Sequence, residues 1–90
     1  MTQRDADKIR KWLEDIFFAH GIFEDVYLDE KKRLVIEDVE GDWKHTHQYL
    51  DYLLEQKGFS LDEEEVANSD SEEISDWYTS THYYVPKKEK

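Results

Sequence analysis

Apolar residues in the first twenty positions recur at the spacing of an amphipathic α-helix. Ile9, Leu13 and Ile16 fall on one face, and mostly charged residues lie between them. A glycine follows the last apolar position of this pattern, and glycine commonly ends a helix because it adopts the left-handed conformation without strain. The pattern therefore predicts a helix over 4–20 that buries this face and ends at Gly21.

The period then shortens from that of a helix to that of a β-strand. Val26 and Leu28 alternate with a tyrosine and an aspartate, and a second β-prone run follows at 34–39. The charged residues 29–32 separate the two runs and are typical of a short turn. Segment 22–39 is therefore predicted to form a β-hairpin.

A second helix is predicted over 42–57. Asp42 is placed to cap its first turn, because an aspartate side chain accepts hydrogen bonds from the unpaired N–H groups there, and Gly58 is placed to end it. Residues at helical spacing form a stripe that we expect to face the core. The stripe consists of Trp43, His47, Leu50, Leu53 and Leu54.

The rest of the chain predicts a second hairpin. A strand begins at Phe59 and becomes acidic, residues 68–71 supply turn chemistry, and 74–85 is a long aromatic strand ended by Pro86. Aromatic residues occupy both alternating faces of this last strand. The pattern of this strand therefore does not decide which of its two faces is buried.

The element order α-β-β-α-β-β predicts an α+β fold. Each element has one apolar side to bury, which favours a four-stranded antiparallel sheet with both helices packed on one face. A chain of 90 residues is expected to form one domain, over 1–86, with a frayed basic tail at 87–90. Its aromatic content of 14% argues for folding without a partner.

The amino-acid composition limits the kinds of site and partner that this protein can have. The chain has no cysteine, which excludes disulfides and thiolate sites, so a reducing cytoplasm is the expected location. No apolar run is long enough for a membrane span, and no membrane association is expected. With 23 acidic against 12 basic residues, the formal net charge of −11 should repel nucleic acid and attract basic surfaces. A basic protein surface is therefore the expected partner, without direct binding of nucleic acid.

The histidines do not predict a metal site or another cofactor. His45 and His47 are two residues apart, and residues at that spacing on a helix point in nearly opposite directions, so the two could share an ion only if the helix began after them. His47 is expected at the edge of the core and His45 in solvent. His20 and His82 lie elsewhere in the chain.

No catalytic motif is present, and the chain is not expected to be an enzyme. Only three glycines occur, each at a predicted helix boundary, so no phosphate-binding loop is indicated. No serine lies in a nucleophile-elbow pattern. A small hydrolase or metal-dependent enzyme that uses His45, His47 or His82 with nearby carboxylates remains the least favoured of three hypotheses.

The acidic run at 62–76 is the most informative feature for function. It contains eight acidic residues and no basic one. Alternate residues on one face of a strand are about 6.6 Å apart, so a hairpin can hold carboxylates in rows that imitate the charge of a nucleic-acid strand. The alternative is an acidic surface that only keeps the protein soluble.

Exposed aromatic residues favour a binding surface as well. Tyr49 and Tyr52 lie on the predicted outward side of the second helix, and Trp77 and Tyr78 lie in the last strand. Tyrosine and tryptophan among carboxylates are typical anchors of an interface with a basic partner. The same aromatic face could instead support self-association, which makes a homodimer the alternative.

The leading hypothesis is a non-catalytic protein that occludes a basic nucleic-acid-binding surface. In size and charge the chain is similar to the small acidic inhibitors that many bacteriophages and mobile elements encode, including DNA mimics, anti-restriction and anti-CRISPR proteins. The alternative is a self-associating accessory domain. The candidate partner-binding residues are Glu37, Asp38, Glu40, Asp42, Asp62, Glu63, Glu64, Glu65, Asp70, Glu72, Glu73, Asp76, Tyr49, Tyr52, Trp77 and Tyr78.

Overall fold

The computed structural model describes residues 2–17, 22–70 and 77–87. Two α-helices, a π-helical segment named η1 and four strands follow one another in the predicted order α-β-β-α-β-β. The elements are α1 (Gln3–Phe17), β1 (Asp25–Leu28), β2 (Leu34–Asp42), η1 (Trp43–His47), α2 (Gln48–Gln56), β3 (Phe59–Asp70) and β4 (Trp77–Pro86).

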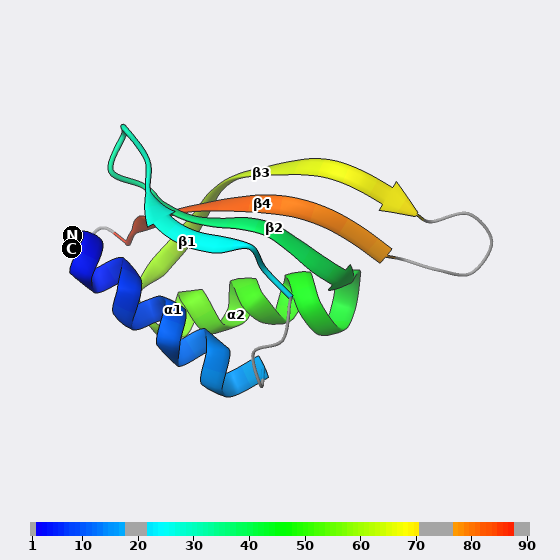
Figure 1. Cartoon of the computed structure of the whole chain (residues 1–90), viewed down its shortest axis with the longest axis horizontal. Helices are drawn as coiled ribbons and strands as arrows, with labels where there is room; N and C mark the ends of the chain where they lie inside the picture. The colour runs from blue at the N-terminus through cyan, green and yellow to red at the C-terminus, as the bar shows by residue number, and fades with distance from the viewer. Residues whose placement is uncertain (1, 18–21, 71–76, 88–90) are drawn as a thin grey trace.

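The four strands form one antiparallel sheet in the order β1-β2-β4-β3. Both helices lie on the same side of this sheet, and β3 and β4 run on beyond them (Figure 1). The predicted α+β class and antiparallel sheet are confirmed. The opposite side of the sheet, called the open face here, is covered by none of the helices in the described residues (Figure 1).

The pairing register decides which side chains enter the core. Leu34 pairs with Tyr84 and Ile36 with His82, and all four are buried under the helices. Because alternate residues point to opposite faces, the odd-numbered residues of β4, such as Tyr83, belong to the open face. The buried hydrophobic core is formed by Ala6, Leu13, Val26, Leu34, Ile36, Val39, Leu50, Leu53, Leu54, Phe59 and Tyr84.

The first helix begins at a reciprocal cap. The Asp5 N–H donates to the Thr2 hydroxyl at 3.3 Å, and Asp5 Oδ2 accepts from the Thr2 N–H at 2.9 Å. Leu13 is fully buried and Ile16 packs against the core, so the predicted inward face is confirmed. The predicted end at Gly21 lies outside the described residues.

The predicted cap at Asp42 begins η1, which continues directly into α2. Asp42 Oδ1 accepts from the His45 N–H at 2.7 Å. Trp43 was wrongly placed in the inward stripe, because the first turn is π-helical and leaves this side chain exposed. Gly58 follows the helix with φ +95°, the left-handed conformation expected of a terminating glycine. Among the described residues, no helix is long and apolar enough to cross a membrane.

The second hairpin differs from the prediction in the length of its first strand. A turn was expected at 68–71, but β3 continues to Asp70, which pairs with Trp77. The ladder hydrogen bonds to β4 outweigh the turn preference of Asn68 and Ser69. Residues 71–76 lie outside the described residues. The Lys87 N–H, assigned to the tail from sequence, donates to the Gly58 carbonyl at 2.8 Å.

Candidate functional site

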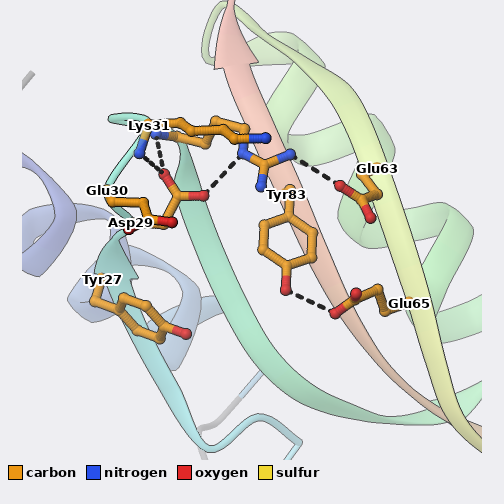
Figure 2. A pocket seen from close by; sticks show the side chains of 8 residues that line it. Tyr27, Asp29, Glu30, Lys31, Glu63, Glu65 and Tyr83 are labelled. Carbon is orange, nitrogen blue, oxygen red and sulfur yellow. Dashed lines mark hydrogen bonds and ion pairs between the residues drawn. The ribbon is translucent and has the colours of Figure 1, made fainter.

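Acidic side chains from β3 and from the β1–β2 turn gather on the open face. Glu63 pairs with Tyr83, and Glu65 pairs with Thr81, which places both glutamates on the side without helices. Asp29 reaches the same region from the turn between β1 and β2 (Figure 2). Together with their neighbours these residues border an open hollow of about 540 Å³, lined by Tyr27, Asp29, Glu30, Lys31, Arg33, Glu63, Glu65 and Tyr83.

One arginine holds several of these carboxylates. The Arg33 guanidinium lies 2.8 Å from Asp62, 3.0 Å from Glu63 and 2.8 Å from Asp29. It also lies 4.4 Å from the centre of the Tyr83 ring, within range of a cation–π contact. Hydrogen bonds to Asp62, Glu63 and Asp29 raise the pKa of Arg33 above its usual value. Arg33 therefore remains charged and links the β1–β2 turn to β3.

The phenols on this face stay protonated at neutral pH. Tyr83 donates to Glu65 at 2.7 Å (Figure 2), and this hydrogen bond is the main reason that its pKa is raised to about 12. Burial, followed by the charge of Glu37, raises the pKa of Tyr27. The open face thus presents ionised carboxylates beside neutral hydroxyl groups.

The acids of β2 occupy different environments. Glu37 lies opposite Asp25 at the β1 edge. Asp38 sits in a bulge with φ +52°, half-buried, and its N–H donates to the Thr81 hydroxyl at 3.2 Å. Glu40 is exposed. The predicted set at 37–42 is therefore not one uniform row of surface charge.

Asp42 has a structural task at the end of β2. Its second oxygen lies 2.7 Å from Nδ1 of His45. The side-chain hydrogen bond with His45 holds the pKa of Asp42 below its usual value. This carboxylate is therefore engaged in starting the helix.

The acids predicted at 62–76 divide into three groups. Asp62, Glu63 and Glu65 are exposed on or beside the open face. Glu64 points to the other side of the sheet, where its side chain is only 15% exposed. Asp70 ends β3, and Glu72, Glu73 and Asp76 lie outside the described residues.

The predicted tyrosines do not join the acidic open face. Tyr49 and Tyr52, 42% and 55% exposed, lie on α2 with ring centres 6.3 Å apart. Tyr78 is half-buried and contacts Trp43 and His47 edge to face. Trp77 is exposed at the start of β4. The tyrosines of α2 and the carboxylates of the open face therefore belong to opposite layers of the fold.

A second candidate site lies inside the protein, where two histidines meet. His47, His82 and Ser80 are completely buried. His47 Nδ1 lies 3.0 Å from His82 Nε2, and the Ser80 hydroxyl oxygen lies 3.1 Å from each. The two rings are parallel to within 8°, with centres 5.2 Å apart. Since the facing nitrogens are much closer than the ring centres, the rings meet edge to edge.

The outer nitrogens of this pair face hydrogen-bond acceptors. His47 Nε2 lies 3.2 Å from each of the Gly41 and Tyr78 carbonyl oxygens. His82 Nδ1 lies 3.1 Å from Asp51 Oδ1, which also accepts from the Tyr84 hydroxyl at 2.6 Å. Burial is the main reason that the pKa of Tyr84 is raised, so this hydroxyl stays a donor.

Hydrogen-bond partners surround both rings of the histidine pair. The outer nitrogens of both rings face oxygen acceptors, and the facing nitrogens lie within hydrogen-bond distance of each other. Burial lowers the pKa of His47, and the His82 ring lies between the carboxylates of Asp51 and Glu64. No buried side-chain nitrogen or oxygen in the described part of the chain lacks a partner.

The connectivity from Ser80 through His82 to Asp51 matches the order of a catalytic triad. The hydroxyl oxygen of Ser80 is, however, completely buried and already contacts Glu64 at 3.2 Å in addition to both histidines. A substrate carbonyl has no approach to this oxygen in the structure. The arrangement therefore supports a role in binding or stability rather than in acyl transfer.

Sequence analysis placed His47 on the inward stripe but did not pair it with His82. His45 and His47 do diverge, with His45 exposed beside Asp42 and His47 buried. One sequence feature could have indicated this pair. Ser80, His82 and Tyr84 occupy every second position and therefore share one face of a strand. Polar side chains on a buried face require partners, but the register that supplies these partners is a tertiary feature.

Comparison with known proteins finds no matching family model, no similar curated protein and no similar solved structure. Conclusions on function therefore rest on the geometry of this chain.

Proposed function

We propose that this protein is a non-catalytic acidic binding protein that occupies a basic nucleic-acid-binding surface of a partner protein. The supporting observation is the open face of the sheet, where Asp62, Glu63 and Glu65 are exposed on or beside the side of β3 that none of the described helices covers. An uncovered face of an antiparallel sheet has a hydrogen-bonded backbone and a row of side chains that a partner can reach.

The strand geometry suits this role. Glu63 and Glu65 are alternate residues on the same face, so their backbone positions are separated by about 6.8 Å. Nucleic-acid-binding proteins place lysine and arginine against a comparable series of negative charges on the phosphate backbone. Glu40 extends the acidic surface onto β2, where it pairs with Thr79.

The charge of the face is only partly neutralised from within. Arg33 supplies one positive charge to the carboxylates of Asp29, Asp62 and Glu63. Because three carboxylates share this one cation, they are held in position and still carry a net negative charge that a basic partner can bind. Glu65 is held by the neutral hydroxyl of Tyr83 and retains its full charge.

The test uses two variants that change the net charge equally at different places. One carries Glu40→Lys and Glu65→Lys on the open face, away from the carboxylates bound to Arg33. Its control carries Asp15→Lys and Glu55→Lys, which are exposed on α1 and α2. DNA-binding proteins from a lysate of the source organism are loaded on immobilised double-stranded DNA, and each purified variant is then added to the column.

The parent chain and the control variant should displace the same partner from the DNA, and the open-face variant should fail to do so. Circular dichroism checks that both variants are folded. If the two variants lose displacement equally, the effect depends only on net charge. That outcome would contradict a specific nucleic-acid mimic. If the parent chain displaces no protein at physiological salt, the proposal is wrong.

The exposed pair Tyr49 and Tyr52 favours self-association as the second candidate function. Two adjacent exposed aromatic rings on one helix are a feature of protein interfaces. Sedimentation equilibrium of the parent chain and of a Tyr49→Ser/Tyr52→Ser variant distinguishes the two. A parent dimer that the variant abolishes would support self-association, whereas monomers in both cases would exclude it.

A further inference from the structure

Four potential ligand atoms converge between η1 and the β3–β4 pair. They are Nδ1 of His47, Nε2 of His82, Oγ of Ser80 and Oε2 of Glu64. The distance between the two nitrogens is 3.0 Å, and Ser80 Oγ lies 3.1 Å from each. Glu64 Oε2 lies 3.2 Å from Ser80 Oγ and 3.7 Å from His82 Nε2. The histidine and glutamate atoms all lie within 4.8 Å of one another.

These separations resemble the edges of a zinc coordination tetrahedron. Zinc bonds to imidazole nitrogen and carboxylate oxygen are about 2.0–2.1 Å long, so neighbouring ligands in a tetrahedral site are about 3.3 Å apart. Five of the six separations, at 3.0, 3.1, 3.1, 3.2 and 3.7 Å, bracket this distance, and the sixth, between the His47 and Glu64 atoms, is within 4.8 Å. The histidine rings meet edge to edge, so both rings must turn toward Ser80 and Glu64 to admit an ion.

The nitrogens that point away from the proposed site, His47 Nε2 and His82 Nδ1, already have the kind of hydrogen-bond partner that histidines in a zinc site have. A histidine that binds zinc usually donates its other N–H to a carboxylate or a backbone carbonyl, which fixes the ligating nitrogen and its direction. His82 directs Nδ1 at Asp51, and His47 directs Nε2 at the Gly41 and Tyr78 carbonyls. Both rings therefore direct their remaining nitrogen inward, where the two face each other beside Ser80.

The charge around this point also suits a cation. A zinc ion at this point would gain a lone pair from each facing nitrogen and the Glu64 carboxylate. Asp51 would balance further positive charge through His82. With Ser80 fully buried, no open coordination position is left for substrate. The ion would therefore be structural, joining η1 to the edge strand β3.

We propose that His47, His82 and Glu64, completed by the hydroxyl of Ser80, form a structural zinc site in this protein. This inference departs from the sequence-based expectation of no metal, which considered His45 with His47 and not His47 with His82.

The test measures zinc binding by the untagged chain after removal of metal with a chelator. Titration with Zn²⁺ in a calorimeter should give one ion per chain, and the ion should raise the melting temperature. Substitution of Co²⁺ should produce the strong visible absorption of a four-coordinate ion. Glu64→Gln keeps the size of the side chain and a hydrogen-bond acceptor for Ser80, and we expect it to weaken zinc affinity at least about tenfold.

Two further variants separate the site from other effects. Asp51→Asn changes the partner of His82 Nδ1 without removing a proposed ligand, and it should weaken affinity about 10–100-fold. His45→Gln removes an exposed histidine outside the site and should leave affinity unchanged. The proposal is overturned if the parent binds no zinc at one equivalent, if folded Glu64→Gln and Asp51→Asn bind it as the parent does, or if His45→Gln abolishes binding.

Discussion

Asp51 on α2 accepts a 2.6 Å hydrogen bond from the hydroxyl of Tyr84 on β4, and this contact joins the helical layer to the centre of the sheet. The same Asp51 oxygen lies 3.1 Å from His82 Nδ1. Tyr84 is almost completely buried and belongs to the hydrophobic core through its ring. One side chain therefore serves both the apolar packing and the buried polar network.

Removing this hydroxyl should destabilise the protein without a change of shape. Tyr84→Phe keeps the ring but deprives the Asp51 carboxylate of a donor, and the loss of a hydrogen bond to a charged group costs about 1.5–3 kcal/mol. Urea denaturation measures the change. Tyr52→Phe, at an exposed position, should alter the free energy of unfolding by less than about 0.5 kcal/mol. Equal effects of the two substitutions would contradict the assigned network.

The buried face of α1 provides a second prediction. Leu13 is completely buried against the core, so Leu13→Ala should reduce the free energy of unfolding by about 2–5 kcal/mol through lost burial and a residual cavity. Lys11→Ala, on the exposed side of the same helix, serves as the control. Chemical denaturation followed by circular dichroism reports both. A small effect at Leu13 would show that α1 packs less firmly than the structure indicates.

Stability should decline at alkaline pH partly through Tyr83. Its hydrogen bond to Glu65 raises the pKa of Tyr83 to about 12 from the ordinary tyrosine value of 10.0. Between these pH values the folded state retains a proton that the unfolded state releases, so the stabilisation is present below pH 10 and is lost as the pH rises through about 12. In a Glu65→Gln variant, the pKa of Tyr83 measured by NMR should fall toward 10. An unchanged pKa would rule out Glu65 as its cause.

At acid pH the stabilisation from the Asp42 helix cap should be lost. The side-chain hydrogen bond with His45 lowers the pKa of Asp42 below 3.8. A carboxylate with a depressed pKa stabilises the fold above its unfolded pKa, and this stabilisation disappears as the pH falls through the folded value. Asp42→Ala should therefore lower the melting temperature at pH 7 and reduce its dependence on pH below about 4. Carboxyl NMR titration of the parent checks the direction of the pKa shift.

Local signals in the sequence were sufficient for the elements themselves. Asp42 and Gly58 delimit the second helix because capping and the left-handed conformation depend on residues within one turn. The alternation around Val26 likewise predicts β1 from side-chain direction alone. Periodicity in each segment shows one apolar side, and two helices and four strands with such sides favour the observed layers.

The choice of buried face in β4 was settled only by tertiary pairing. Both faces of this strand carry aromatic residues, so its own pattern is ambiguous. Pairing of His82 with Ile36 and of Tyr84 with Leu34 turns the even-numbered residues toward the helices. The extension of β3 to Asp70 follows from the same ladder, which supplies hydrogen bonds that the turn preference of this segment does not predict.

The two candidate sites differ in how much of them the sequence determines. Its acidic density predicts a charged surface, because charged side chains remain in solvent wherever the chain places them. Their division between the open face and the interior, with Glu64 inside and Glu65 outside, depends on the register of β3. The contact of His47 with His82 joins residues from η1 and β4. Contacts between distant segments require the packed layers, and for this reason only the tertiary structure brings the two histidines together.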